Sequence, residues 1–260
     1  MVKPIVRRQR EERLYDRITN KQGVVMTIIE YRNSKDIDVE FEDGYILKNV
    51  RYDHFKDRSL KSLLSKSVNG VGFIGVGEYK CSINSKITRE YNAWEHMIKR
   101  CVDEKFKSKN ATYVDCSISE EFLNFQEFAR FYTENKWTDE VNLIPDKDIK
   151  IKGNKLYSKE TVLLVDARIN SLFTQRTNDR GKYLIGVTKK HGKFYARMSD
   201  GKGDMVFIGS YDNEMEAFYA YKREKEKFIK QVADEYRAKY PSFPTKIYDA
   251  MCAWEVDVND

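Results

Sequence analysis

The stretch from Asp146 to Phe173 constrains the fold of this chain more than any other, because it places two strand-like runs, a tight turn and a helix-like tail in one short segment. A charged run beginning at Asp146 predicts the first strand, and Gly153-Asn154 predicts the turn that ends it. The run from Lys155 to Val165 predicts the second strand, and Asp166 to Phe173 predicts the helix. We expect the rest of the chain to be organised around this unit.

Length and composition favour several small folded modules. The chain has 260 residues, more than a single small core usually holds, and its 41% hydrophobic and 34% charged residues suit soluble, folded modules. Lys and Arg outnumber Asp and Glu by 47 to 41, which favours an anionic partner. No apolar run approaches the length of a membrane span, so we expect a cytoplasmic protein with no membrane contact.

Two patterns that resemble cofactor sites are discounted. The cysteines are Cys81, Cys101, Cys116 and Cys252, and no two of them are close enough for zinc-finger spacing, so reduced thiols are expected. Residues 70–75 match the glycine spacing of a dinucleotide-binding loop, but no helix starts directly after them to receive a pyrophosphate. We interpret this glycine-rich stretch as a connection between modules.

The beginning of the chain combines a basic segment with alternating strands. Arg7, Arg8 and Arg10 lie among polar neighbours, and residues 1–17 form either a solvated helix or a flexible arm along phosphates. From Ile18 to about Leu64 apolar and polar residues alternate, which predicts antiparallel strands in a small Tudor-like barrel. Because its exposed edge is acidic, we expect the barrel to set orientation or meet a protein rather than grip DNA.

Two amphipathic helices are expected before Asp146. The first covers Lys86 to Phe106 and places aromatic and apolar residues at three-four spacing. The second begins near Ser117, where the sequence Ser-Ile-Ser-Glu fits a capping box. Their many aromatic side chains must be buried, and the unit of two strands and a helix is the expected packing partner.

Three short strands and a long helix are predicted after residue 181. The strands cover Gly186 to Thr188, Lys193 to Ser199 and Asp204 to Tyr211, and the helix begins at Asp212 or Asn213. The helix covers one face of this sheet, and the other face is expected to present Thr188, Lys190, His191, Tyr195, Arg197, Ser199 and Phe207. Such a face suits the major groove of double-stranded DNA, and a protein-binding sheet is the alternative.

Two regions resemble known families. Residues 91–173, with AWEHMIKRC, YVDCSISEEFLNFQEF and DKDIKIKGNKLYSKET, resemble phage-encoded HNH-type homing endonucleases. Residues 181–229 resemble the plant Apetala-type (ethylene-response-factor) DNA-binding domain, although Thr188 and Ser199 stand where that family commonly has arginine. The resemblance implies a site-specific DNA nuclease of a mobile element, acting in the cytoplasm of a bacterial host.

The first resemblance also implies a metal site. By position Asp146 matches the acidic metal ligand, Asn170 matches the ligand on the helix, and Lys147 stands where the general-base histidine belongs. A lysine is ordinarily protonated, so Asp148, expected on the same strand face as Asp146, is the alternative ligand or base. Oxygen ligands favour Mg²⁺ or Mn²⁺. A solvated pair of carboxylates without metal remains an equal alternative.

These patterns predict a modular α+β protein. The expected segments are a basic arm and small β-barrel (1–67), a glycine-rich linker (68–85), helices with the HNH-like unit (86–180), an Apetala-type domain (181–240) and a tail packed on a neighbouring module (241–260). The expected function is site-specific binding of double-stranded DNA with metal-dependent cleavage. The alternatives are a non-catalytic DNA-binding regulator, a phage factor that acts on a host protein through the barrel, and a protein-interaction module throughout.

Overall fold

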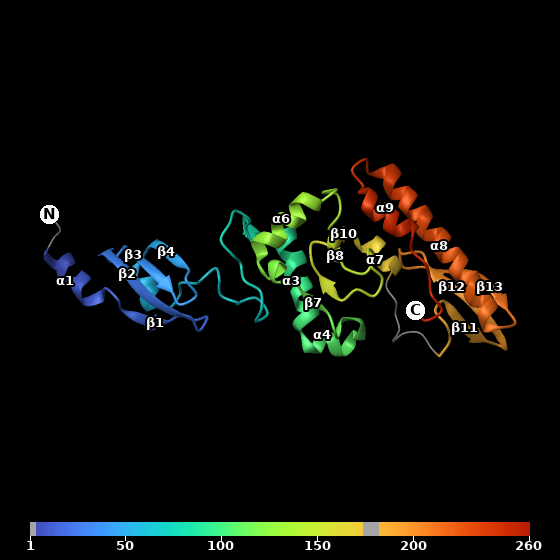
Figure 1. Cartoon of the computed structure of the whole chain (residues 1–260), viewed down its shortest axis with the longest axis horizontal. Helices are drawn as coiled ribbons and strands as arrows, with labels where there is room; N and C mark the ends of the chain where they lie inside the picture. The colour runs from blue at the N-terminus through green and yellow to red at the C-terminus, as the bar shows by residue number, and fades with distance from the viewer. Residues whose placement is uncertain (1–3, 174–181) are drawn as a thin grey trace. The chain divides into compact units, whose positions relative to one another are not determined.

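The computed structural model describes residues 4–173 and 182–260, with side chains from residue 8 onward except that of Ala111 (Figure 1). The chain is α+β as predicted, and its strands form several small sheets. Two compact units divide it: one contains the described residues up to Lys109 together with Glu120–Arg130, and the other contains Asn110–Ser119 and the described residues from Phe131 onward. The expected division into smaller segments stays a prediction.

The first unit opens with a helix and an antiparallel sheet. Helix α1 (Pro4–Arg13) precedes β1 (Arg17–Thr19), β2 (Val25–Asn33), β3 (Asp36–Phe41) and β4 (Ile46–Val50), and α2 (Tyr52–Lys56) follows. The four strands pair in the order of the sequence. The alternation of apolar and polar residues has its expected effect in β3 and in β2 as far as Ile28, and a register shift after Ile28 returns Tyr31 to the same side. The core of this sheet contains Met26, Ile28, Tyr31, Ile37, Val39 and Phe41, with Phe55 and Leu60.

This sheet is open, so the expected closed barrel is wrong. Among the described residues β1 and β4 are the edges of the sheet and do not pair with each other. Closure requires backbone hydrogen bonds between the first and last strands, and β1 has only three residues to offer. Irregular register between β2 and β3, near Ile28 and Tyr31, bends the sheet without closing it.

The glycine-rich stretch packs on the helices of the first unit. Helix α3 (Arg89–Val102) follows a hairpin of β5 (Ser82–Ile83) and β6 (Lys86–Ile87), and α4 (Glu104–Lys109), α5 (Glu120–Leu123) and α6 (Phe125–Asn135) come later. A Cβ atom at Gly72 would lie 2.5 Å from a methyl group of Ile98, and one at Gly75 would meet the side chain of Asn124. These glycines therefore permit close packing against the helices.

The stretch from Asp146 to Phe173 contains shorter strands than expected. Antiparallel β8 (Ile144–Asp146) and β10 (Leu163–Val165) pair, and α7 (Ala167–Phe173) follows them. The residues after Asp146 leave the strand, and only β9 (Leu156–Tyr157) interrupts the connection. Strand β9 pairs in parallel with β7 (Ser117–Ile118), which follows the short helix η1 (Ala111–Tyr113). The predicted continuous strand from Lys155 to Val165 is therefore wrong.

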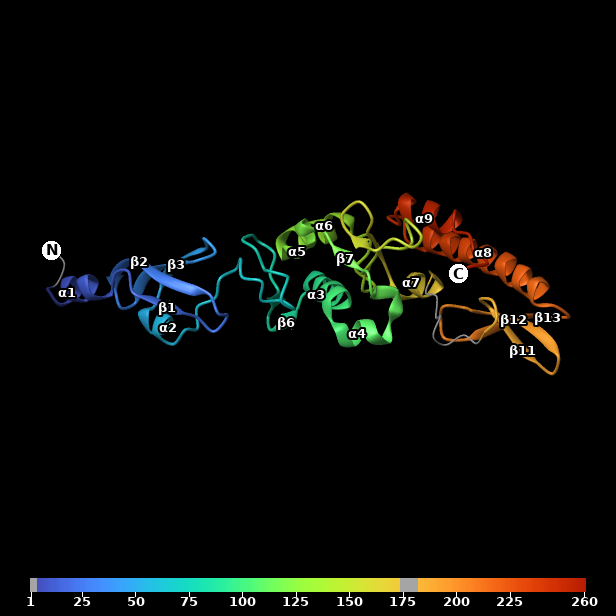
Figure 2. The same cartoon turned by 60° about the horizontal axis from the view of Figure 1, so that its bottom comes forward.

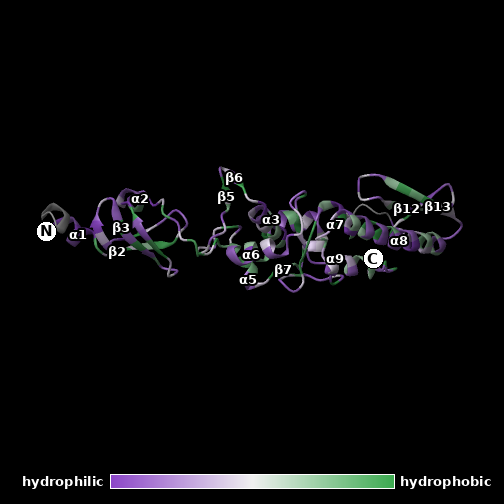
Figure 3. Cartoon of the chain, turned by 90° about the horizontal axis from the view of Figure 1, so that it is seen from above, coloured by the Kyte–Doolittle hydropathy of each residue, from purple (hydrophilic) through white to green (hydrophobic). Residues whose placement is uncertain are grey.

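A three-stranded sheet and a long helix form the C-terminal part of the second unit (Figure 2). Strands β11 (Val187–Lys190), β12 (Lys193–Ser199) and β13 (Met205–Tyr211) pair antiparallel in sequence order, as expected. Helix α8 (Glu214–Lys239) begins at the cap Asn213, whose side chain accepts a hydrogen bond from the Glu216 amide at 2.9 Å. Polar and apolar residues alternate along α8 (Figure 3), because one face of this helix is buried.

Helix α8 covers one face of this sheet. Their shared core contains Val187, Ala196 and Met198 from the strands and Ala217, Phe218, Ala220 and Tyr221 from the helix. Val256, in the tail that follows α9 (Thr245–Cys252), joins the same core. The opposite sheet face has no covering helix among the described residues. None of the helices in residues 4–173 and 182–260 combines the length and apolar character of a membrane span.

Candidate functional site

A buried lysine organises the loop after β8. The side chain of Lys147 is 1% exposed, and its ammonium donates to Oδ2 of Asp148 at 2.6 Å and to the carbonyl oxygen of Asn154 at 2.8 Å. The ring centroids of Tyr113 and Tyr157 lie 5.7 and 5.9 Å from Nζ. A carboxylate, a carbonyl and two aromatic faces thus surround one internal cation.

The charge of Lys147 is stabilised by its neighbours. Burial by itself lowers the pKa of Lys147, but the hydrogen bond and the negative charge of Asp148 outweigh it, so the net pKa is raised. A general base must be able to accept a proton, and this amine is already protonated at neutral pH. The geometry therefore gives Lys147 the role of a structural cation.

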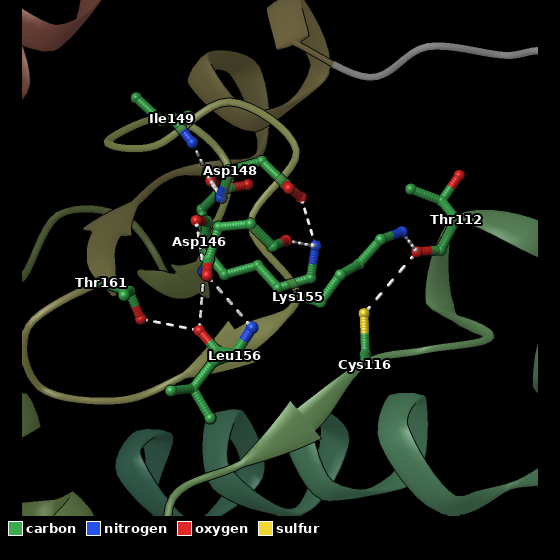
Figure 4. A network of polar contacts seen from close by, with 10 residues as sticks. Thr112, Cys116, Asp146, Asp148, Ile149, Lys155, Leu156 and Thr161 are labelled. Carbon is green, nitrogen blue, oxygen red and sulfur yellow. Dashed lines mark hydrogen bonds and ion pairs between the residues drawn. The ribbon is translucent and has the colours of Figure 1, made fainter.

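Asp146 shapes the end of β8. Its Oδ1 atom accepts hydrogen bonds from the backbone amides of Asp148 and Ile149, each at 2.8 Å (Figure 4). Burial raises the pKa of the Asp146 carboxyl, and these two amide bonds only partly oppose the rise. A side chain that binds the backbone two and three residues ahead turns the chain, which explains why the strand ends here.

Asp148 lies beyond the strand, so the expected common strand face with Asp146 is wrong. Its carboxylate is directed to Lys147. Asn170 lies half-buried in α7, one turn after Asp166. Asp166 begins this helix by accepting a bond from the Ile169 amide at 2.8 Å, and the hydroxyl of Tyr236 donates to its other oxygen at 2.5 Å. Burial is the main cause that raises the pKa of Tyr236, and its bond to Asp166 adds to the rise.

Polar side chains brace the remainder of the loop. The hydroxyl of Thr161 donates to the carbonyl of Leu156 at 2.7 Å (Figure 4) and accepts from the Ser158 amide at 3.1 Å. Lys155 donates to the carbonyl of Thr112 at 2.7 Å, and the thiol of Cys116 approaches the same oxygen at 3.6 Å. These side chains hold the loop at Leu156 and Ser158 and against Thr112.

The donor atoms around Asp146 suit a divalent cation poorly. One oxygen of Asp146 already accepts two amide bonds, and the carboxylate of Asp148 is paired with a lysine. A divalent ion there would be repelled by the ammonium of Lys147. In the described part of the chain no three His, Cys, Asp or Glu side chains gather into a possible metal site. Mg²⁺ or Mn²⁺ at Asp146, Asp148 and Asn170 stays a prediction.

The uncovered face of the C-terminal sheet brings most of the predicted DNA-contacting residues together. Thr188 pairs with Tyr195, Tyr195 with Ser210, and Arg197 with Phe207, so these side chains share one face. Lys190 pairs with Lys193 at the next same-face position, and His191 follows in the turn with a φ angle of 51°. Thr188, Lys190, His191 and Arg197 are exposed.

A β-bulge places Phe207 on this face. Ala196 pairs with Gly209 and Arg197 with Phe207, so Ile208 is the extra residue on β13. Simple alternation from Ser210 would turn Phe207 toward the helix, and the bulge reverses that. Phe207 is 56% exposed, its ring centroid lies 6.0 Å from that of Tyr195, and the Arg197 guanidinium lies 6.0 Å from the Tyr195 centroid.

Two residues of this face, Lys193 and Met205, were not predicted from the sequence, and one predicted residue, Ser199, is less exposed than expected. Lys193 is exposed and pairs with Asp212 at 2.5 Å, and Met205 is 62% exposed. The sequence carried one signal for the bulge, Gly209 inside a strand. Ser199 is half-buried, and its hydroxyl accepts a bond from the Gly201 amide at 3.2 Å, so it supports the hairpin turn.

The basic start of the chain is helical. Arg8 pairs with Glu12 at 2.9 Å and Arg10 with Glu30 at 3.2 Å, both at exposed positions. The side chain of Arg7 lies outside the described residues. On the acidic strand β3, Asp36 and Asp38 both bind the guanidinium of Arg32, which lowers the pKa of both carboxyls. This pairing reduces the negative charge of β3, which lies between β2 and β4 and not at the edge of the sheet.

The chain matches no protein-family model, no curated protein and no solved structure.

Proposed function

We propose that this protein binds double-stranded DNA with the uncovered face of β11–β13. The observation that supports this most directly is the gathering of Lys190, His191, Tyr195, Arg197 and Phe207 on one sheet face, opposite the helix that buries the other. Among the described residues no helix covers these cationic and aromatic side chains, and an exposed apolar patch of this kind is typical of a surface that binds another molecule.

The chemistry of this face fits the major groove. Arg197 offers paired donors of the kind that guanine accepts, and Lys190 supplies positive charge for phosphates. Phe207 and Met205 offer apolar surface of the kind that contacts the methyl group of thymine. The face is therefore suited both to backbone attraction and to discrimination between bases.

Helix α8 provides a rigid support for this face. Its first half is packed on the sheet, and its second half is anchored to α7 by the hydrogen bond between Tyr236 and Asp166 and the ion pair between Arg168 and Glu235, at 2.8 Å. Binding sites on rigid elements lose less conformational freedom when they bind. In this proposal the stretch from Asp146 to Phe173 serves as the scaffold on which the sheet is mounted.

The proposal is tested by titrating a fluorescent duplex of random sequence with the full chain and recording anisotropy at several NaCl concentrations. Duplex binding that weakens steeply with salt is expected, because phosphate contacts release counterions. Absence of binding at about 50 mM salt would remove the proposal and favour a protein-binding sheet.

Metal-dependent cleavage of DNA is the second candidate. The order of antiparallel β8 and β10 followed by α7, with Asp146 at the end of β8 and Asn170 on the helix, favours it. A supercoiled plasmid incubated with the protein and Mg²⁺, Mn²⁺ or chelator distinguishes the candidates. Metal-dependent nicking that disappears in Asp146→Ala supports a nuclease, whereas an intact plasmid with retarded mobility supports binding alone.

A further inference from the structure

The uncovered face of β11–β13 is apolar along one edge and basic along the other. In the described part of the chain β13 is an outer strand of this sheet, and it turns two large apolar side chains to the uncovered face, Met205 and Phe207. They are 62% and 56% exposed. At the other edge, β11 turns Lys190 to the same face. The two edges therefore suit different parts of a DNA duplex.

The bulge at Ile208 fixes the position of Phe207. Without this extra residue, alternation from Ser210 would turn Phe207 toward α8, where the apolar core of the sheet lies. The backbone irregularity instead holds the ring in water, on the face opposite the helix. Bulges that re-aim a side chain are frequent beside active sites, so we expect this ring to have a partner outside the chain.

The base edges of the major groove offer one apolar group to such a ring. They present hydrogen-bond donors and acceptors, apart from the C5 methyl group of thymine. A phenyl ring placed on the donors and acceptors would remove their water without replacing its hydrogen bonds. Cytosine that is methylated at C5 carries the same apolar group at the same position of its ring. Phe207 is therefore suited to a pyrimidine with a C5 methyl group.

Arg197 lies where it can reach the neighbouring base pair. It is the partner of Phe207 across β12 and β13, and the side chains of such partners start about 5 Å apart. Successive nucleotides of a strand are about 3.4 Å apart along the duplex axis. The Tyr195 ring lies 6.0 Å from the Phe207 ring and 6.0 Å from the Arg197 guanidinium, so the three side chains form one cluster. A guanine that accepts both donors of Arg197 would thus lie beside the pyrimidine that contacts Phe207.

We propose that this face recognises a guanine beside a pyrimidine that carries a C5 methyl group, with Arg197 on the guanine and Phe207 on the methyl group. Thymine and 5-methylcytosine both supply that group. This inference rests on the proposed function, since it names the bases that the same sheet face contacts. Phe207 selects for the methyl group and Arg197 for the guanine, in neighbouring base pairs.

The test uses the duplex that the full chain selects from a random-sequence library. Each thymine of this duplex is replaced singly by deoxyuridine, which lacks only the C5 methyl group. At a thymine beside a guanine the affinity should fall about threefold, because an apolar contact is lost. The replacement should have no effect on binding by Phe207→Ala, and Phe207→Leu, which keeps an apolar side chain, should retain most of the effect. Tyr219→Ala, at a 58% exposed position of α8, is the matched control and should show the full loss.

A second set of duplexes distinguishes the two sources of the methyl group. A C·G pair replaces the T·A pair at the sensitive position, with either cytosine or 5-methylcytosine. The unaltered protein should bind the methylated duplex about threefold more tightly, and Phe207→Ala should bind both equally. Equal affinities in the unaltered protein would overturn the 5-methylcytosine half of the inference and leave thymine as the pyrimidine that is recognised.

The outcomes separate this inference from the proposed function. If the unaltered protein binds duplex DNA but no thymine beside a guanine is sensitive to loss of its methyl group, the inference is wrong and the sheet proposal stands. The same holds if Phe207→Ala shows the full loss, because another residue then contacts the methyl group. If the unaltered protein binds no duplex, both are wrong.

Discussion

The loop after β8 and the uncovered face of β11–β13 use basic side chains in opposite ways. In the loop, Lys147 is buried and its charge is matched by Asp148 and by the Asn154 carbonyl. On the sheet, Arg197 is exposed, and its guanidinium lies 6.0 Å from the centroid of the Tyr195 ring. A buried cation requires partners inside the protein, whereas an exposed one keeps its capacity to bind another molecule.

This difference separates a structural role from a binding role. Changes in the loop should alter the free energy of unfolding, and changes on the sheet face should alter DNA affinity while stability stays constant.

The largest effect is expected for Lys147→Met. Methionine fills a similar volume but leaves Asp148 and the Asn154 carbonyl without a donor, so the free energy of unfolding should fall by about 3 kcal/mol. Urea denaturation measures it. The control Lys230→Met, at an exposed position of α8, should change stability by less than about 0.5 kcal/mol. Equal effects of the two variants would mean that Lys147 does not organise the loop.

Arg197→Ala should weaken binding to the preferred duplex by about tenfold and relax the choice of base at one position, because a paired donor to guanine is lost. Selection from a random duplex library followed by affinity measurement gives both quantities. Arg223→Ala removes an exposed arginine from α8 and is the matched control. If both variants lose the same affinity and no selectivity, Arg197 contributes charge alone.

A smaller effect, a loss of about threefold, is expected for Phe207→Ala, because its contact with DNA is apolar and local. The melting temperature should not change, since the ring is already 56% exposed. Tyr219→Ala, at a 58% exposed aromatic position on α8, should leave affinity unaltered. A loss of stability in Phe207→Ala would assign the ring to the fold instead.

The smallest effect is expected for Asp146→Asn, and it should depend on pH. Because burial raises the pKa of Asp146 above its unfolded value, ionisation of this carboxyl opposes folding at neutral pH. The amide oxygen of asparagine still accepts the two backbone bonds, so the variant should be more stable than the parent at pH 7. This advantage should shrink as the pH falls and disappear below about 3, where both the folded and the unfolded states of the parent are protonated.

Thermal melts between about pH 3 and pH 7, with and without Mg²⁺, test this prediction. If Asp146 were a metal ligand, Mg²⁺ would raise the melting temperature of the parent protein, and Asp146→Asn would abolish that rise.

Local patterns in the sequence were enough to predict the elements whose residues alternate regularly. The strands β2, β3 and β12 and the helix α8 follow from their period and from the cap at Asn213. The position of Phe207 on the open face was also expected, although the bulge at Ile208 that puts it there was not.

The loop after β8 was beyond sequence reasoning for a physical reason. A run such as Asp-Lys-Asp-Ile-Lys alternates like a strand, but the Asp146 side chain binds the amides ahead of it and stops the strand. The partners that bury Lys147 are Asn154 and Tyr157 of the same loop and Tyr113 of the earlier helix η1, and no local pattern in the sequence predicts that Tyr113 meets the loop. Long-range packing therefore decided the role of this lysine.

The most direct test of DNA binding by the sheet is photocrosslinking from Phe207. A photoreactive phenylalanine analogue is placed at Phe207 or at Tyr219 in the full chain, each is irradiated with a labelled duplex at low salt, and the covalent protein–DNA product is counted. Crosslinking from Phe207 and none from Tyr219 is expected, because Phe207 lies on the uncovered sheet face and Tyr219 on the helix. DNA that is bound but crosslinks from Tyr219 alone would contradict the assignment of the sheet as the DNA-binding face.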